Sequence, residues 1–337
     1  MTESPKPTAK TGWRKLLAIP TPVIFLVCVV IAALLLWWQG SLAELWDVAK
    51  DASIVPMLLA APIYLVSMWL LAIRWHELVR MAQGWSDLPR AAEAFFTSVV
   101  INYAAPVGLA VPSRAALTKR ALGMDKHSTG VVALWEIGRD VLVLGVASLI
   151  WMVSARGSAS AVGDELGANA SRYTNFGLIG LALVLVVLVF FFRKAEQRRR
   201  AVHFISRILV SPLERPRIAI QALLFTIGYW VTQGIVLALL VHAMGVDVSF
   251  VFILGLTSLP MLIGMLSPIP GGAVVREAMM YVVARLADVP GAEVVAAAVI
   301  YRMALFIAIP ILYGITRIWL SRRGAGHPNL PQPESVG

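Results

Sequence analysis

The sequence is poor in charged residues and has a single cysteine. Charged residues make up 14% of the 337 positions, against about 25% in an ordinary soluble domain. Because Cys28, inside an apolar run, is the single cysteine, it forms no intrachain disulfide and cannot build a metal site alone. The chain also lacks a Walker-type glycine loop, a paired-aspartate motif, a histidine cluster and a nucleophile elbow. These absences argue against an ATPase and a metal-dependent hydrolase, and no cofactor is expected.

The sequence is rich in long apolar runs. A helix needs about 20 apolar residues to cross a bilayer. Six runs qualify, at residues 20–38, 54–73, 129–153, 174–192, 217–243 and 291–319. Backbone groups in lipid must be hydrogen-bonded internally, and the runs lack the alternation of barrel strands. We therefore expect an all-α polytopic membrane protein with one transmembrane domain over 16–320 and disordered cytoplasmic tails at 1–15 and 321–337.

Two further apolar stretches are interrupted. Residues 95–112 contain Pro106, and residues 250–280 contain Pro268 and Pro270. Proline removes a backbone donor and glycine loosens a helix, so neither stretch is expected to be a continuous helix. Basic clusters flank the first stretch on both sides, and a crossing would place one of them outside. We therefore expect two re-entrant hairpins of broken helix in addition to the six full spans.

The distribution of basic residues predicts the orientation. In this threading both termini and the arginine-rich loop 193–217 are cytoplasmic, as the positive-inside rule favours. The segments outside then carry only Lys50, Arg156, Arg172 and Arg285. This bias accounts for the net charge of +10 without a nucleic-acid partner. The chain is expected to be a multi-pass protein of the cell membrane.

The two hairpins belong to a predicted repeat with halves at about 54–153 and 217–319. In each half an arginine follows the hairpin proline by eight positions, and a second arginine lies 33 or 34 positions after that proline, inside the next span. The threading makes one hairpin enter from the cytoplasm and the other from outside. Inverted repeats of this kind occur in transporters, with substrate sites near the midplane. The matching residues are Pro106, Arg114 and Arg139, and Pro268, Arg276 and Arg302.

Two arginines are expected near the centre of the membrane. Arg139 and Arg302 lie about 15–16 Å into their spans, and a central arginine needs a compensating partner. Glu136 and Asp140 lie on the same helical face as Arg139, so the three form either a substrate site or a structural ion-pair cluster. Arg302 has no near carboxylate in its own span. Its partner is expected to be Glu136, Asp140, Glu277 or a substrate anion.

The hairpin tips supply the remaining candidate residues. A broken helix presents free N–H donors and a positive dipole end, which suit an anion. The arginine fork also matches phosphate or carboxylate, so we predict an anionic headgroup; the alternative is a plain bend whose arginine reaches the interface. The full set of candidate substrate-binding residues is Asn102, Arg114, Glu136, Arg139, Asp140, Pro268, Gly271, Gly272, Arg276, Glu277 and Arg302.

These motifs resemble the lysylphosphatidylglycerol synthase transmembrane family, also described as flippase-like membrane proteins. The resemblance covers about residues 20–320 and rests on the 95–114 hairpin, the Pro-x-Pro-Gly-Gly turn followed by Glu277, and the arginines of the following spans. It implies movement of lipids or lipid-linked sugars between leaflets. Some relatives add a cytosolic aminoacyl transferase. Since about fifteen residues follow the last span here, lysyl-lipid synthesis is not expected.

We therefore expect a lipid transporter or flippase-like protein, not an enzyme. Its partner would be an anionic phospholipid or a polyprenyl-phosphate-linked lipid, held by intramembrane arginines. Relatives often carry a Gly-Glu pair where this chain has Gly108-Leu109, and the lost acid and additional Arg276 make this site more cationic. Two alternatives stay open: an intramembrane enzyme acting on a lipid-phosphate carrier, and a lipid-binding scaffold that does not transport.

Overall fold

The computed structural model describes residues 52–104, 110–154, 206, 208, 210–247, 249–266 and 275–323. Every regular element within these residues is an α-helix, which agrees with the all-α class. The predicted spans at 20–38 and 174–192 and the N-terminal tail lie outside the described residues, as does nearly all of the C-terminal tail. The proline turns at 105–109 and 267–274 lie outside them too, and with them Pro268, Gly271 and Gly272.

Four described helices are long and apolar enough to cross a membrane. They are α4 (Ile54–Gln83), α7 (Lys126–Ser154), α10 (Pro216–Ala243) and α13 (Gly291–Arg322). They correspond to four of the six predicted spans. Each has 28 to 32 residues and so extends more than about 40 Å, beyond a hydrocarbon core about 30 Å thick. Their outer faces expose many large aliphatic side chains, as a surface in contact with lipid does.

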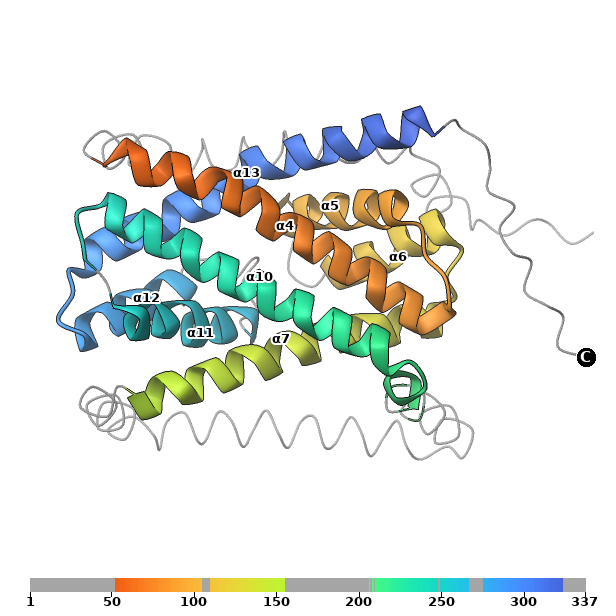
Figure 1. Ribbon diagram of the computed structural model, residues 1–337, viewed down its shortest axis with the longest axis horizontal. Coiled ribbons are helices and arrows are strands. Elements are labelled where there is room, and N and C mark those ends of the chain that lie inside the picture. Colours follow the sequence, from red (N-terminus) through yellow and green to blue (C-terminus); the bar gives the residue numbers. More distant parts are fainter. Residues whose placement is uncertain are drawn as a thin grey trace, which may run out of the picture.

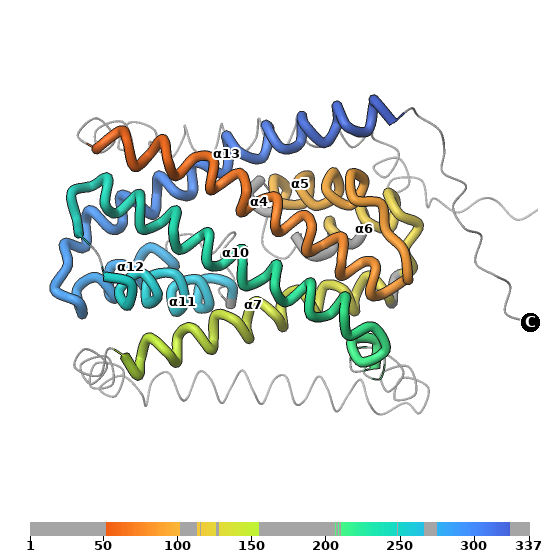
Figure 2. The backbone as a smooth tube through the Cα atoms, viewed as in Figure 1, coloured from red at the N-terminus to blue at the C-terminus, as the bar shows by residue number. Residues whose placement is uncertain are grey.

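Each predicted interrupted stretch contains a pair of short helices. The first pair is α5 (Leu88–Ala104) and α6 (Ala110–Leu122), and the second is α11 (Phe250–Leu266) and α12 (Val275–Leu286). The 17-residue helices α5 and α11 extend about 26 Å, and α6 and α12 about 20 Å or less, so each is shorter than the hydrocarbon core. Figures 1 and 2 show the two pairs near opposite ends of the long helices.

The two halves of the described chain pack in the same way. Each half has the order long, short, short, long: α4 to α7, then α10 to α13. The first helices, α4 and α10, pack against each other, while α7 packs on α11 and α13 packs on α5. The contacts α4–α5, α5–α6 and α6–α7 correspond to α10–α11, α11–α12 and α12–α13. The contacts of one half are therefore those of the other with the helices exchanged.

Small and aromatic residues set the closest helix approaches. A Cβ atom added to Gly255 on α11 would lie 2.4 Å from the indole nitrogen of Trp151 on α7, so only glycine allows this contact. Across the α4–α10 interface the Gln233 amide donates a hydrogen bond to the Ser67 hydroxyl. Polar bonds of this kind join helices in an apolar surrounding.

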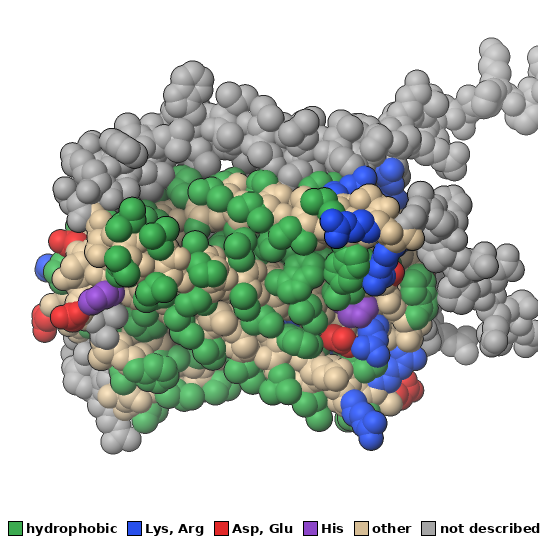
Figure 3. Space-filling model, turned by 45° about the horizontal axis from the view of Figure 1, so that its top comes forward, with side chains coloured by type: hydrophobic (Ala, Val, Ile, Leu, Met, Phe, Trp, Pro, Cys, Tyr) green, Lys and Arg blue, Asp and Glu red, His purple; other side chains and the backbone are tan. Residues whose placement is uncertain are grey.

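Basic side chains gather at one end of the molecule, on the right of Figure 3. This is the end where α4 and α13 terminate and α10 begins. At the opposite end, where α10 and α12 terminate and α13 begins, the described residues include a single arginine, Arg285, together with Asp247 and Asp288. The described residues thus have the charge asymmetry that the sequence predicts. The basic residues in the helix turns at the end where α4 and α13 terminate include Arg80, Lys119, Arg120, Arg215, Arg217, Arg322 and Arg323.

Candidate functional site

Arg74 forms the centre of a buried group of charges between α4 and α7. Its guanidinium donates hydrogen bonds to Asp140 at 2.5 Å and to Glu136 at 3.0 Å. The Arg74 side chain is 2% exposed, and Asp140 and Glu136 are 8% and 12% exposed. A buried arginine with two carboxylates is a strong link between helices, because breaking it would leave charge without a partner in an apolar surrounding.

Arg114 links the first hairpin to the same carboxylates. From α6 it donates hydrogen bonds to both oxygens of Glu136, and its Nε donates to the Ser98 hydroxyl on α5 at 2.8 Å. Its guanidinium also lies 4.8 Å from the centre of the Phe95 ring and 5.4 Å from that of Trp75, within cation–π distance. Arg114 is thus held by α5 and α7 and does not simply extend to the interface.

Asp140 receives a second donor from α10. The indole nitrogen of Trp230 donates to the Asp140 carboxylate oxygen at 2.9 Å. Asp140 therefore joins α7 to both α4 and α10. We call the five residues Arg74, Arg114, Glu136, Arg139 and Asp140 the first charge cluster.

Arg139 differs from the other arginines of this cluster. Its guanidinium donates to the Trp135 carbonyl at 3.3 Å and approaches the Met81 sulfur at 3.8 Å, and no carboxylate hydrogen bond to it occurs among the described residues. Glu136 and Asp140, which the sequence places on the helical face of Arg139, are hydrogen-bonded to Arg74 and Arg114 instead. Arg74 and Arg114 reach these carboxylates from facing helices, whereas Arg139 extends back along its own helix toward Trp135.

A second charge cluster joins α12 to α13. Glu277 accepts hydrogen bonds from Arg302 and, at 3.3 Å, from Arg276. Arg276 and Glu277 are each 8% exposed, and the Arg276 guanidinium lies 5.5 Å from the centre of the Tyr301 ring. Glu277 is one of the partners expected for Arg302, and the structure identifies it as the one bonded. We call Arg276, Glu277 and Arg302 the second charge cluster.

A third contact connects the first hairpin with the last helix. Glu93 on α5 accepts a hydrogen bond from Arg317 on α13 at 3.0 Å, and the Tyr313 hydroxyl donates to it at 3.5 Å. Arg317 is 47% exposed, so this pair is more accessible than the two charge clusters. It is a structural link between α5 and α13.

The structure brings the predicted residues together in two groups. Arg114, Glu136, Arg139 and Asp140 lie in the first charge cluster, and the second consists entirely of predicted residues. The Asn102 side chain lies outside the described part of the structure. Sequence reasoning missed Arg74, although it is the only charged residue between Ile54 and Trp75. Two carboxylates, Glu136 and Asp140, accompany the single arginine Arg139 on α7. This excess of negative charge indicates a further cation on another helix.

A family model described as Lysylphosphatidylglycerol synthase TM region matches residues 25–313. This chain belongs to that family. The match covers every described helix from α4 to α12 and most of α13. No curated protein and no solved structure matches the chain. Membership of the lysylphosphatidylglycerol synthase transmembrane family indicates a lipid-related function in a membrane, which agrees with the resemblance stated from the sequence.

Proposed function

We propose that this protein moves an anionic lipid between the two leaflets of the cell membrane, with the headgroup held by intramembrane arginines. The lipid would be a phospholipid or a polyprenyl-phosphate-linked lipid. The observation that carries the proposal is the guanidinium of Arg139, which lies within a membrane-long helix without a carboxylate hydrogen bond among the described residues. An arginine at this depth is costly unless an anion or water compensates it.

The charge balance of both clusters supports an anionic ligand. The first charge cluster has three arginines and two carboxylates, and the second has two arginines and one carboxylate. Each therefore carries one excess positive charge within the described residues. A headgroup phosphate can neutralise one such charge and accept bidentate hydrogen bonds from a guanidinium. The two clusters would then be two positions that the headgroup occupies in turn.

The matching packing of the two halves supports transport over static binding. We infer an inverted repeat in which α4–α7 and α10–α13 are equivalent and the two hairpins enter from opposite sides. The exchanged contacts and the position of the short helix pairs near opposite ends are what such a repeat requires. Transporters of this construction expose a central site to each side in turn by moving one repeat against the other. The first charge cluster is built on one half and the second on the other.

The orientation follows from the same arrangement. We infer that the end rich in lysine and arginine faces the cytoplasm, with both termini on that side, as the positive-inside rule favours. The α5–α6 hairpin would then enter from the cytoplasm, because its helices are too short to cross and basic residues lie at both of its ends. The α11–α12 hairpin would enter from outside.

Leaflet exchange in reconstituted vesicles tests the proposal. Purified protein is incorporated with headgroup-labelled phosphatidylglycerol, and both exchange and headgroup turnover are measured. We expect exchange with an intact headgroup, and a loss of about tenfold or more in Arg139→Gln, since a charge-assisted hydrogen bond contributes about 1.5–3 kcal/mol. Arg217→Gln is the matched control because Arg217 is an exposed arginine at the start of α10. Equal exchange in wild type, Arg139→Gln and Arg302→Gln would reject the arginine site, and turnover of the headgroup would favour an enzyme.

A further inference from the structure

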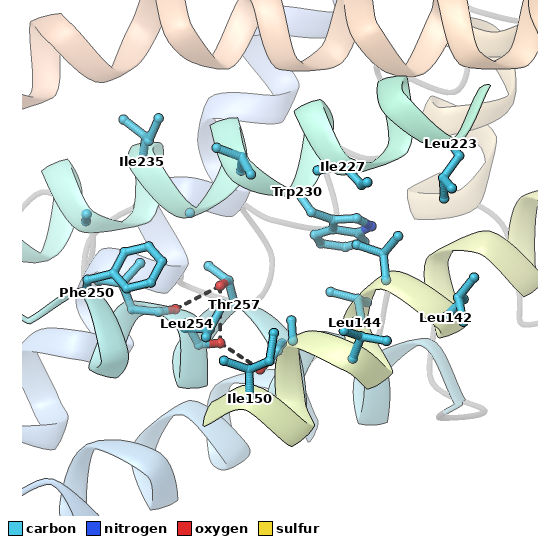
Figure 4. Close-up of a pocket in the computed structure, with 18 residues that line it drawn as sticks. Leu142, Leu144, Ile150, Leu223, Ile227, Trp230, Ile235, Phe250, Leu254 and Thr257 are labelled. Carbon is cyan, nitrogen blue, oxygen red and sulfur yellow. Dashed lines mark hydrogen bonds between the residues drawn. The ribbon is translucent and has the colours of Figure 1, made fainter. Parts of the chain in front are cut away.

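An apolar groove runs between α7, α10 and α11. Its volume is about 620 Å³, and eighteen residues line it. The lining on α10 extends from Leu223 to Ala238, a distance of about 22 Å by the helical rise. Figure 4 shows Trp230 and Ile227 on one wall, and Leu144 and Ile150 on the other. We call this space the α7–α10–α11 groove.

The groove offers no unused hydrogen-bond donor from its polar side chains. The Thr257 hydroxyl donates to the Ile253 carbonyl at 2.8 Å, and the Ser258 hydroxyl donates to the Leu254 carbonyl at 2.6 Å. The Trp230 indole donates to Asp140 at 2.9 Å. Every donor among the lining side chains is therefore already bonded within the protein. The part of a ligand that lies here must be hydrocarbon, since a polar group would lose its hydration without gaining a partner.

One end of the groove adjoins the first charge cluster. Leu142 and Val143, which line the groove, follow Arg139 by three and four positions on α7, about one helical turn. The Arg139 guanidinium extends in the other direction, toward Trp135, so the glycerol of a bound lipid would bridge the groove and the headgroup phosphate. Trp230 belongs to both sites, because its ring lines the groove and its nitrogen bonds Asp140. A molecule with a charged end at Arg139 and an apolar tail would thus find both parts of its binding site on the same three helices.

The geometry points to one occupant. We propose that the α7–α10–α11 groove holds an acyl chain of a glycerophospholipid whose monoanionic phosphodiester headgroup binds Arg139. This rests on the proposed function and specifies the lipid class for the same site. The single excess positive charge of the first charge cluster matches a monoanion. The groove is about 22 Å long, which exceeds half of a hydrocarbon core, about 15 Å, and therefore leaves room for one acyl chain, which spans about one leaflet. A long polyprenyl chain would extend well beyond it.

Photolabelling of the purified full chain tests the groove. Phosphatidylglycerol with a photoactivatable group on its acyl chain is bound in detergent micelles, and labelled residues are identified by mass spectrometry. Ala147→Phe fills the groove from α7, and Leu149→Phe is the matched control because Leu149 is 62% exposed on the same helix and does not line the groove. We expect label on groove residues, reduced at least fivefold in Ala147→Phe and unchanged in Leu149→Phe. Ala238→Phe fills the groove from α10 and provides the same test if Ala147→Phe does not fold.

Competition with unlabelled lipids tests which headgroup the site binds. Excess unlabelled phosphatidylglycerol should remove the label from the groove. Zwitterionic phosphatidylcholine, whose ammonium cancels the phosphate charge, should not. Label that phosphatidylcholine or a polyprenyl phosphate displaces better, or label that Ala147→Phe and Ala238→Phe leave unchanged, would overturn the inference. Leaflet exchange is measured on the same samples. Groove labelling as expected with no exchange in wild type rejects transport and leaves the acyl site standing, whereas exchange with label only elsewhere rejects the groove.

Discussion

Arg74 on α4 and Asp140 on α7 form a hydrogen-bonded ion pair of 2.5 Å in which both side chains are buried. Asp140 has the Trp230 indole as its only other described donor, and Arg74 has Glu136 as its only other described acceptor. This pair therefore links α4 to α7 and, through the Trp230 bond of Asp140, to α10 beside Arg139. The pair positions the first charge cluster, whereas the Arg139 guanidinium has no carboxylate hydrogen bond among the described residues and is the proposed contact of the headgroup.

Removing Arg74 should strongly destabilise the protein. Arg74→Met leaves Asp140 with only the indole donor in a buried position, and breaking a buried pair in this way costs about 3–5 kcal/mol. The double variant Arg74→Met/Asp140→Asn should recover part of the loss, because the remaining amide carries no charge. Thermal unfolding in detergent measures both. Equal stability of Arg74→Met and wild type would show that the pair does not hold the helices together.

Arg139→Gln should leave stability nearly unchanged while weakening binding of the anionic lipid. The substitution leaves no carboxylate without a partner, because Glu136 and Asp140 keep the hydrogen bonds from Arg74 and Arg114. The measurement compares the unfolding temperature with the affinity for phosphatidylglycerol in one preparation. A fall in unfolding temperature as large as that of Arg74→Met would contradict this separation of roles.

The second charge cluster should show energetic coupling between its two helices. Arg302→Gln and Glu277→Gln are made singly and together, and the double-mutant cycle should give a coupling of about 0.5–3 kcal/mol for residues in direct contact. Arg302→Gln paired with Glu293→Gln is the control, since Glu293 lies nine positions away near the start of the same helix. Coupling as small as that of the control pair would mean that the Arg302–Glu277 bond contributes little to the fold.

The approach of α7 to α11 should depend on the absence of a side chain at Gly255. Gly255→Ala places a methyl group about where the Trp151 indole lies, so α11 must move or Trp151 must turn away. Gly145→Ala on α7 is the control, because no atom lies within 4 Å of its added Cβ and alanine is the better helix former. We expect a lower unfolding temperature for Gly255→Ala only. Similar values for the two variants would show that this contact adapts without cost.

Much of the fold follows from the sequence because its signals are local. The length of the apolar runs predicts four spans that are long helices in the structure. Pro106 falls between α5 and α6, and Pro268 falls between α11 and α12. The sequence also predicts that Arg302 pairs with one of three carboxylates or with a substrate anion, because a charge at that depth must be compensated. These inferences need only the bilayer thickness and the cost of burying charge.

The partners of the first charge cluster could not be read in the same way. In a helix that is apolar on all sides, the sequence pattern does not show which face meets protein and which meets lipid. Arg74 therefore resembled the first member of the basic cluster that continues at Arg80 and Arg90, although it is buried against α7. The groove was equally hidden, because its lining residues have the same apolar character as those that face lipid.

The proposed opposite orientation of the two hairpins predicts opposite labelling of four engineered cysteines. Cys28→Ser removes the native cysteine. Single cysteines then replace Asp87 before α5 and Lys119 near the end of α6, or Asp247 before α11 and Ala292 at the start of α13. If each short helix pair enters and leaves on one side, both members of a pair react with a membrane-impermeant thiol reagent from the same side. We expect reaction from the cytoplasm for the first pair and from outside for the second. Reaction of positions 87 and 119 from different sides would mean that the first hairpin crosses the membrane, and the inverted repeat would then be rejected.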